Sequence, residues 1–241
     1  MMSAPNQLIA TNMKAALLFL CLVAISSAQE AAHSARILFL NGPEGAAGPY
    51  YLFDGKETQE VELPRMSFSP VYDLRAGDFK LWLLTKPPVD AKSVPEGAPF
   101  VLVPAGVTDF YLICGVDPSN QVLPIQLRIV NANSDKIGRG EMQWFNLTAK
   151  AVIGKVGSQD LRLGPKATFL VKEPVTGDKS YPIELYFRVD GDDRTHPLIE
   201  SQWSHDPRTR SIVFVFDEGK RRAPRVMAFS DFRTPKEKEK P

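Results

Sequence analysis

The residue types most often used in catalysis are few in this chain. The three histidines are His33, His196 and His205, and the segment Ser204-His205-Asp206 contains the residue types of a hydrolytic triad. A triad is assembled from separate parts of a fold, with the histidine held between the serine and the acid. Three consecutive residues do not provide that geometry, so we interpret His205 as part of a capped turn. The Gly-x-Ser-x-Gly motif of a nucleophilic serine does not occur.

One dense group of carboxylates is compatible with a metal ion. Asp190, Asp192 and Asp193 surround Gly191, and hard cations are bound by several oxygen ligands. The same residue types form the turn of a β-hairpin, which the apolar runs on both sides favour. The sequence has no His-x-x-x-His, Cys-x-x-Cys or EF-hand pattern. We therefore predict no metal and no cofactor, and keep the three aspartates as weak metal candidates.

Two tryptophans are candidates for ligand binding. Exposed aromatic rings form platforms against which ligands such as sugars stack. An internal repeat, given below, aligns Trp82 with Phe169, so we interpret Trp82 as a core residue. Trp144 and Trp203 remain as the candidate ligand-binding residues.

Two further motifs have structural interpretations. Cys114 ends an apolar run, which is typical of a buried, unreactive thiol. The triplet Asn146-Leu-Thr148 is an acceptor for N-glycosylation. It lies in a predicted strand, and we assign no function from it.

Composition and charge restrict the partners. The chain has 241 residues, of which 44% are hydrophobic and 24% charged, with 20 Pro and a formal net charge of +1. These values exclude a collagen, a coiled coil, a polytopic membrane protein and a wholly disordered chain. The near-zero charge gives no reason to expect nucleic acid as a partner.

The N-terminal segment has the features of an export signal. Lys14 precedes the apolar run Ala15–Ile25, and small residues follow as far as Ala28. The run is shorter than the about 20 apolar residues that cross a bilayer. We therefore predict a signal peptide over residues 1–28, with Met13 as an alternative start. The mature protein would be periplasmic, in the cell envelope or extracellular, and would hold no internal disulfide because one cysteine remains.

The rest of the chain is predicted to form β-strands. Apolar and β-branched runs of about four to eight residues recur between Gly, Pro, Asn and Asp, and no helical periodicity follows Ala35. The run Ile212–Phe216 is apolar on both faces, which predicts a central strand covered on both sides. The other predicted strands are Ile37–Leu40, Tyr50–Phe53, Val71–Leu74, Phe79–Leu84, Phe100–Val103, Phe110–Cys114, Ile125–Val130, Met142–Leu147, Val152–Val156, Ala167–Val171, Ile183–Val189, Ile199–Trp203 and Val226–Phe229.

An internal repeat predicts two related domains. The segment Asp73-Leu-Arg-Ala-Gly77 recurs as Asp160-Leu-Arg-Leu-Gly164, and each copy continues through an apolar run to a proline. Two upstream pairs align as well, Ile37–Asn41 with Leu127–Asn131 and Tyr51–Asp54 with Gln143–Asn146. We predict an all-β protein with tandem β-sandwich domains over residues 35–117 and 121–232, followed by a charged tail over 233–241. The boundary would lie in the turn-rich stretch Asp117–Asn120.

The first half resembles a known group of domains. The resemblance rests on Ile37–Asn41 before Pro43, on Tyr51–Gly55, and on Tyr72–Gly77 before the strand Phe79–Leu84. This order of strands and polar turns is similar to small secreted bacterial β-sandwich domains of unknown function. The resemblance implies an immunoglobulin-like or transthyretin-like fold, and it implies no catalytic residues.

Together these features predict a protein that binds rather than catalyses. We expect a non-enzymatic exported protein that binds or scaffolds in the cell envelope, with an envelope protein or a polysaccharide as partner. After signal cleavage it would not be an integral membrane protein. One alternative is a carbohydrate-binding module using Trp144 and Trp203. The other is a secreted hydrolase with a carboxylate site around Asp190–Asp193 or near His205.

Overall fold

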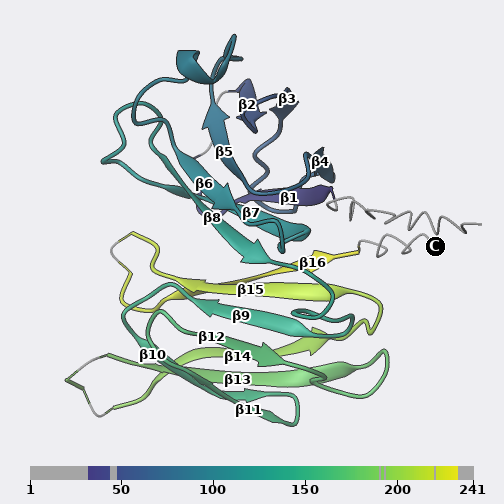
Figure 1. Ribbon diagram of the computed structural model, residues 1–241. Coiled ribbons are helices and arrows are strands. Elements are labelled where there is room, and N and C mark those ends of the chain that lie inside the picture. The colour runs from purple at the N-terminus through teal and green to yellow at the C-terminus, as the bar shows by residue number, and fades with distance from the viewer. Residues whose placement is uncertain (1–31, 44–47, 190, 193, 220, 233–241) are drawn as a thin grey trace, which may run out of the picture.

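The computed structural model describes residues 32–43, 48–189, 191–192, 194–219 and 221–232. Within these ranges the chain forms sixteen strands in four four-stranded sheets, and its only helical element is the short 3-10 turn η1 (Ala91–Ser93) (Figure 1). The all-β prediction is therefore confirmed. The predicted signal peptide and charged tail, including Met13 and Ala28, lie outside the described residues.

Domain 1 is a sandwich of two sheets. Sheet A has the strand order β4-β1-β7-β8, and sheet B has the order β3-β2-β5-β6. Inward-facing side chains of both sheets, among them Ile37, Leu81 and Leu112, form one apolar core. The strands are β1 (His33–Phe39), β2 (Tyr50–Phe53), β3 (Thr58–Val61), β4 (Tyr72–Leu74), β5 (Phe79–Leu84), β6 (Phe100–Val103), β7 (Asp109–Val116) and β8 (Ile125–Asn131).

Domain 2 repeats this arrangement. Sheet C has the order β12-β9-β15-β16, and sheet D has the order β11-β10-β13-β14. Its core contains Trp144, Val152, Leu185 and Val213. The strands are β9 (Met142–Asn146), β10 (Ala151–Val156), β11 (Gln159–Leu163), β12 (Thr168–Val171), β13 (Ser180–Arg188), β14 (His196–Ser204), β15 (Arg210–Phe216) and β16 (Arg225–Asp231).

Each strand of domain 1 therefore corresponds to the strand eight places later in domain 2. The correspondence includes the single parallel pair of each domain, β1 with β7 and β9 with β15. The two domains repeat one topology, but the predicted sequence alignment is wrong by one strand. Asp73–Gly77 covers the end of β4 and its turn, whereas Asp160–Gly164 covers most of β11, and β12 is the true counterpart of β4. A leucine between polar residues before a glycine suits the end of many edge strands, so the motif recurs at a non-equivalent turn.

The domain boundary also differs from the prediction. Strand β8 pairs with β7 from Val116↔Ile125 to Phe110↔Asn131, so residues 125–131 belong to domain 1. The turn-rich stretch Asp117–Asn120 is the loop of this hairpin, and the chain passes between domains after Asn131 and before Met142. Turn residues mark a hairpin loop as readily as a domain boundary.

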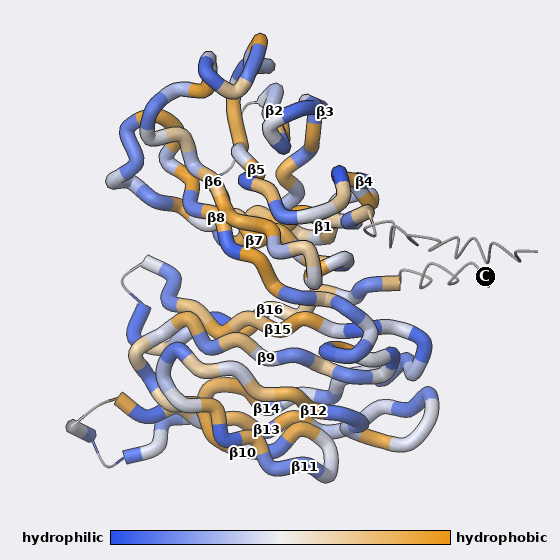
Figure 2. The backbone as a smooth tube through the Cα atoms, in the orientation of Figure 1, coloured by the Kyte–Doolittle hydropathy of each residue, from blue (hydrophilic) through white to orange (hydrophobic). Residues whose placement is uncertain are grey.

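The four sheets are stacked in the order B, A, C, D. The outer face of sheet A packs against the outer face of sheet C through a third apolar cluster, in which Tyr111 and Ile113 of β7 meet Ile212 and Phe214 of β15. Hydrophobic residues accordingly line the strands in the middle of the stack (Figure 2). The prediction for Ile212–Phe216 is confirmed, because its two faces lie in different cores. Sheets B and D each keep one outer face toward solvent.

All the predicted runs occur as strands, but two strands were not predicted. These are β3 and β11, which carry polar side chains and occupy equivalent sheet edges in the two domains.

Candidate functional site

Exposed apolar side chains concentrate in domain 1. Isolated exposed apolar residues are normal on a protein surface, but a group of them often marks an interaction site. Among the described residues, every large exposed apolar side chain except Phe232 belongs to domain 1. The others are Met66, Val71, Val89, Phe100, Leu102, Val116 and Val122.

An aromatic row crosses the outer face of sheet B. Phe53 of β2 lies opposite Trp82 of β5, and Trp82 lies opposite Phe100 of β6. The ring centroids of Phe53 and Trp82 are 5.6 Å apart. Exposure increases along the row, since Phe53 is buried, Trp82 is half-buried and Phe100 is 48% exposed. Side chains alternate between the two faces of a strand, so these three rings point away from the domain core.

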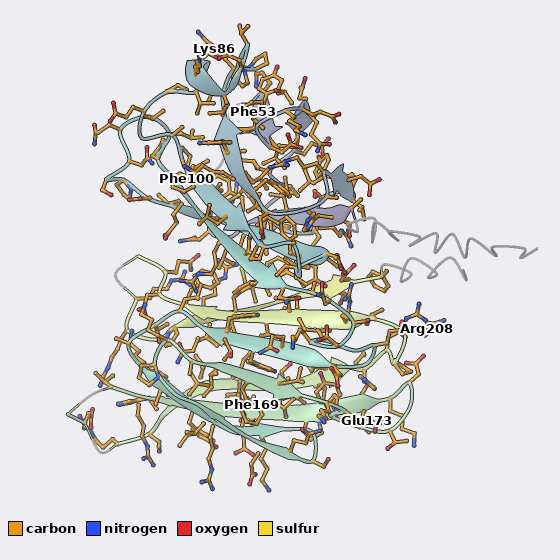
Figure 3. The ribbon with its side chains drawn as sticks, in the orientation of Figure 1. Phe53, Lys86, Phe100, Phe169, Glu173 and Arg208 are labelled. Atoms are coloured by element: carbon orange, nitrogen blue, oxygen red, sulfur yellow. The ribbon has the colours of Figure 1, made fainter. Side chains whose placement is uncertain are left out.

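Lys80 places a positive charge on this row. Its Nζ atom lies 4.2 Å from the ring centroid of Phe100 and 5.3 Å from that of Trp82. A cation over an aromatic ring is attracted by the ring's negative face. Leu102, 67% exposed, lies opposite Lys80 on β6. We call Lys80, Trp82 and Phe100 the sheet B face, and Figure 3 shows Phe53 and Phe100 in domain 1.

A groove lies beside the sheet B face, where β5 ends. It has a volume of about 270 Å³ and runs between the loop after β5 and the β7–β8 loop. Asp90 caps the short turn η1 in the first loop by accepting hydrogen bonds from the backbone of Lys92 and Ser93. The lining is largely apolar and includes Leu84, Pro87, Pro95, Val122 and Leu123. Apolar surface therefore continues beyond the sheet B face.

The corresponding face of sheet D is charged. A shallow groove there is lined by Lys155, Asp160, Arg162, Glu184 and Tyr186, among others. The Tyr186 hydroxyl donates a hydrogen bond to Glu184, which raises the pKa of Tyr186. The two outer faces of the molecule thus share a topology and differ in chemistry.

The structure does not support Trp144 as a ligand platform. Trp144 has no exposed surface, and its indole N–H is buried without a hydrogen-bond partner among the described residues. Trp203 is half-buried and stacks on Trp144, with ring centroids 6.0 Å apart and planes 7° apart. A platform needs a free ring face, and Trp144 has none.

The prediction that Trp82 is a core residue is wrong, because Trp82 lies on the outer face of sheet B. Its predicted counterpart, Phe169, lies on β12 opposite the buried Trp144, whereas Trp82 lies on β5. A signal in the sequence could have corrected this interpretation. Lys80 alternates with Trp82 and Leu84 on one face of β5, and a lysine is almost never fully buried. The face carrying Lys80 is therefore the one that meets solvent.

The aspartate group does not form a cation site in the described part of the chain. Asp190 and Asp193 lie outside the described residues. Asp192 accepts hydrogen bonds from the side chain of Arg194 and interacts with His196 and Arg222. The Arg194 side chain is the main cause that holds the pKa of Asp192 well below its usual range. Across the described ranges no group of three or more His, Cys, Asp or Glu side chains is placed to hold a metal ion.

His205 is held by backbone carbonyls. Its Nδ1 lies 2.9 Å from the carbonyl oxygen of Gly177, and its Nε2 lies 2.9 Å from that of Gly140. His33 in domain 1 is buried in the same manner, between the carbonyls of Val107 and Gly77. These contacts hold both imidazole rings inside the protein. Asp206 turns away to Arg208, whose side chain lowers the pKa of Asp206, and no triad forms with Ser204.

Two other predicted features are structural. Burial raises the pKa of the Cys114 thiol far above its ordinary value, so Cys114 stays a neutral core residue at neutral pH. Asn146 is buried, and its amide nitrogen donates to the carbonyls of Lys150 at 2.6 Å and Gly164 at 2.9 Å. These bonds close the β9–β10 loop and leave the amide inaccessible for glycosylation in the folded protein.

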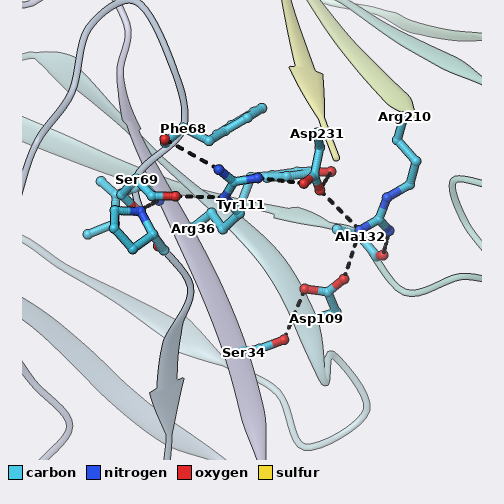
Figure 4. A network of polar contacts seen from close by, with 11 residues as sticks. Ser34, Arg36, Phe68, Ser69, Asp109, Tyr111, Ala132, Arg210 and Asp231 are labelled. Carbon is cyan, nitrogen blue, oxygen red and sulfur yellow. Dashed lines mark hydrogen bonds and ion pairs between the residues drawn. The ribbon is translucent and has the colours of Figure 1, made fainter. Parts of the chain in front are cut away.

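A buried polar network fixes the two domains together. The Asp231 carboxylate, with no exposed surface, lies 2.6 Å from Nη1 of Arg36 and 3.1 Å from Nη2 of Arg210 (Figure 4). The Tyr111 hydroxyl donates to the same carboxylate at 2.5 Å. Arg210 also reaches Asp109 of domain 1 at 3.2 Å. Asp231 of domain 2 thus binds side chains of both domains at once, and these contacts fix the orientation of one domain relative to the other.

Comparison with protein families and with curated proteins does not assign the chain to a family. No model of a protein family matches the chain, and no curated protein is significantly similar to it. Within the described ranges, no helix has the length and apolar character needed to cross a membrane.

Proposed function

We propose that the protein is a non-enzymatic, exported binding module of the cell envelope that recognises its partner through the sheet B face. The observation that carries this proposal is the exposure of Phe100, together with the partial exposure of Trp82, beside Lys80 on a folded domain. Aromatic side chains are enriched at the centres of protein interfaces, where they contribute most of the binding energy. Among the described groups first considered for catalysis, His205, Asp192 and Asp206 form hydrogen bonds to other parts of the protein itself, which favours the exposed sheet B face as the functional site.

The fold supports this role because it presents the sheet B face rigidly. Phe53 is the buried end of the row and packs against Trp82, and Lys80 contacts two rings, so the side chains are held before a partner arrives. The Asp231 network and the apolar cluster between sheets A and C attach domain 1 firmly to domain 2. A preorganised surface loses less conformational entropy on binding, and this increases affinity.

The proposal is tested by retention of native envelope components on the immobilised mature protein. Lys80→Glu and Trp82→Ala should each lower retention about tenfold or more, as expected for residues at the centre of an interface. Arg162→Glu is the matched control, because it makes the same charge change on the outer face of sheet D. Equal retention by all four proteins would overturn the assignment of the sheet B face.

A polysaccharide is the second candidate partner, and the partly exposed ring of Trp82 favours it. Sugar rings stack against aromatic faces, and the row offers Trp82 and Phe100 on neighbouring strands. Affinity electrophoresis through gels containing purified envelope polysaccharide distinguishes the two partners. Retardation that is lost in Trp82→Ala supports a carbohydrate ligand, whereas unchanged migration of the wild type leaves a protein as the partner.

A further inference from the structure

Strand β6 presents free backbone groups at the edge of sheet B. The amide of Leu83 donates to the carbonyl of Pro99 at 3.1 Å, which places residues 99, 101 and 103 in the hydrogen-bonded positions against β5. In an antiparallel ladder these positions alternate. The N–H and C=O groups of Phe100 and Leu102 therefore point away from β5, toward an edge that no other described strand pairs with, while β8 of sheet A lies close to β6 without pairing.

The same two residues carry the exposed apolar side chains. Phe100 is 48% exposed and Leu102 is 67% exposed. The strand reads Phe-Val-Leu-Val and contains no charge, proline or bulge, although Pro99 and Pro104 limit it to four residues. Unpaired edges that combine free backbone with apolar side chains readily pair with another strand.

Domain 2 provides an internal control at the equivalent edge. The amide of His205 donates to the carbonyl of Lys179 at 2.9 Å, so Glu200 and Gln202 are the β14 residues whose backbone points to the free edge. Their side chains are polar and exposed. Strand β14 also contains Pro197 and a bulge near Leu198. Charge, proline and bulges within a strand prevent strand addition, and β6 has none of them between Phe100 and Val103, so its short length is the one protective feature that it keeps.

We propose that β6 pairs antiparallel with β6 of a second copy of this chain, joining two B sheets into one eight-stranded sheet. With Val101 on the two-fold axis, Phe100 of each copy lies opposite Leu102 of the other. All four free groups of each edge then form hydrogen bonds, since opposite residues in a hydrogen-bonded pair exchange both bonds. The exposed apolar side chains cover one another, as a self-complementary interface requires.

The local composition favours a second copy as the occupant. The prolines restrict pairing to four residues, and an identical strand matches that length and the apolar pattern. Lys80 is the charged residue beside this edge on the sheet B face. In the dimer the two Lys80 strands are three strand spacings apart, about 14 Å, which exceeds the screening length of about 8 Å at physiological salt. Repulsion between the copies is therefore small.

The dimer goes beyond the proposed function and does not depend on it. Dimerisation would double the sheet B face into one continuous surface, and two linked binding surfaces gain avidity. Because four residues form a small contact, we expect a dissociation constant on the order of 10 μM.

Sedimentation velocity over about 1 to 300 μM mature protein tests the proposal. The wild type should shift from monomer to dimer, and Leu102→Lys should weaken association at least about tenfold, because an edge lysine opposes strand pairing. The matched control Gln202→Lys, on the equivalent strand of domain 2, should associate like the wild type. A wild type that stays monomeric throughout, or an equal effect of both lysines, would overturn the proposal.

A second variant separates backbone pairing from side-chain contact. Leu102→Pro removes an N–H that faces the free edge and keeps every bond between β5 and β6, so the domain should fold with an unchanged thermal midpoint. It should remain monomeric, and a dimer as strong as that of the wild type would contradict strand pairing. Retention of envelope components by the wild type at concentrations below dimerisation tests the sheet B face separately, so each proposal can fail without the other.

Discussion

The two outer sheets, B and D, have the same topology, but the solvent-facing side of sheet B is aromatic and apolar and that of sheet D is charged. Sheet B shows aromatic rings and an apolar edge strand, while sheet D shows charged side chains and an edge strand with Glu200, Gln202 and Pro197. Both domains share the β-sandwich frame, so the frame alone does not determine whether a face binds. The difference lies in the alternate residues of the strands that face solvent. Domain 2 shows how the fold looks when its edge is protected, and domain 1 shows the same edge available for association.

The largest expected effect tests whether both faces belong to one rigid body. Asp231→Ala should lower the free energy of unfolding by about 3–5 kcal/mol, because Arg36, Arg210 and Tyr111 lose their shared buried carboxylate. Chemical denaturation measures this. Asp206→Ala removes a pair with the exposed Arg208 side chain and serves as the control, with a much smaller loss of stability expected than for Asp231→Ala. Equal stability of the Asp231 variant and the wild type would show that the network does not hold the domains together.

Two tryptophans sharpen the contrast between core and surface. Trp144→Ala should cost about 3–5 kcal/mol of stability because it leaves a large cavity beneath Trp203. Trp82→Ala should cost clearly less, because its ring is partly in solvent, and should act on binding instead. Denaturation curves and retention assays on both variants measure the two effects. If Trp82→Ala lowered the free energy of unfolding as much as Trp144→Ala does, the assignment of Trp82 to the surface would be wrong.

Alkaline pH should act on one buried acid in each domain. Burial raises the pKa of Tyr181 in domain 2 to about 12, and it raises the pKa of Cys114 in domain 1. A raised pKa gives stability that is complete below the unfolded pKa and is lost as pH rises through the folded pKa. For Tyr181 this window runs from about pH 10 to 12, with a loss of at most about 3 kcal/mol. Tyr181→Phe should remove that part of the alkaline slope, and an unchanged slope would contradict the assignment.

The smallest expected effect is a gain of association at the protected edge. Glu200→Phe combined with Gln202→Leu gives β14 the side-chain pattern of β6 at its free edge. We expect self-association to increase by about tenfold at most, because Pro197 and the bulge near Leu198 still oppose pairing. Sedimentation of this variant in a Leu102→Lys background isolates the new contact. No association in that background would mean that side-chain pattern alone does not make an edge available.

The fold was largely predictable from the sequence, because strand patterning is local. Period-two runs between turn residues identified the apolar strands, and Ile212–Phe216 was apolar on both faces because it lies between two cores. The apolar pattern does not predict strands β3 and β11, because edge strands of a hairpin need few apolar residues. The domain boundary was misplaced because Asp117–Asn120 has the residues of a turn, and only strand pairing shows that the turn closes a β7–β8 hairpin.

The site was less predictable, because it depends on which face of a strand meets solvent. The run Phe79–Leu84 is apolar at most positions, and its hydrophobicity does not distinguish the two faces. Lys80 marks the solvent face, but the misaligned repeat placed Trp82 in the core. The exposed edge of β6 could not be predicted at all, because strand order within a sheet arises from contacts between distant parts of the chain.

Residue-resolved amide exchange at low and high protein concentration tests the difference between the two edges most directly. The free-edge amides of Phe100 and Leu102 should exchange rapidly in dilute protein and slow markedly as the dimer forms. The amides of Glu200 and Gln202 should exchange rapidly at both concentrations. Exchange at Phe100 and Leu102 that does not change with concentration, or equal slowing at both edges, would contradict the account.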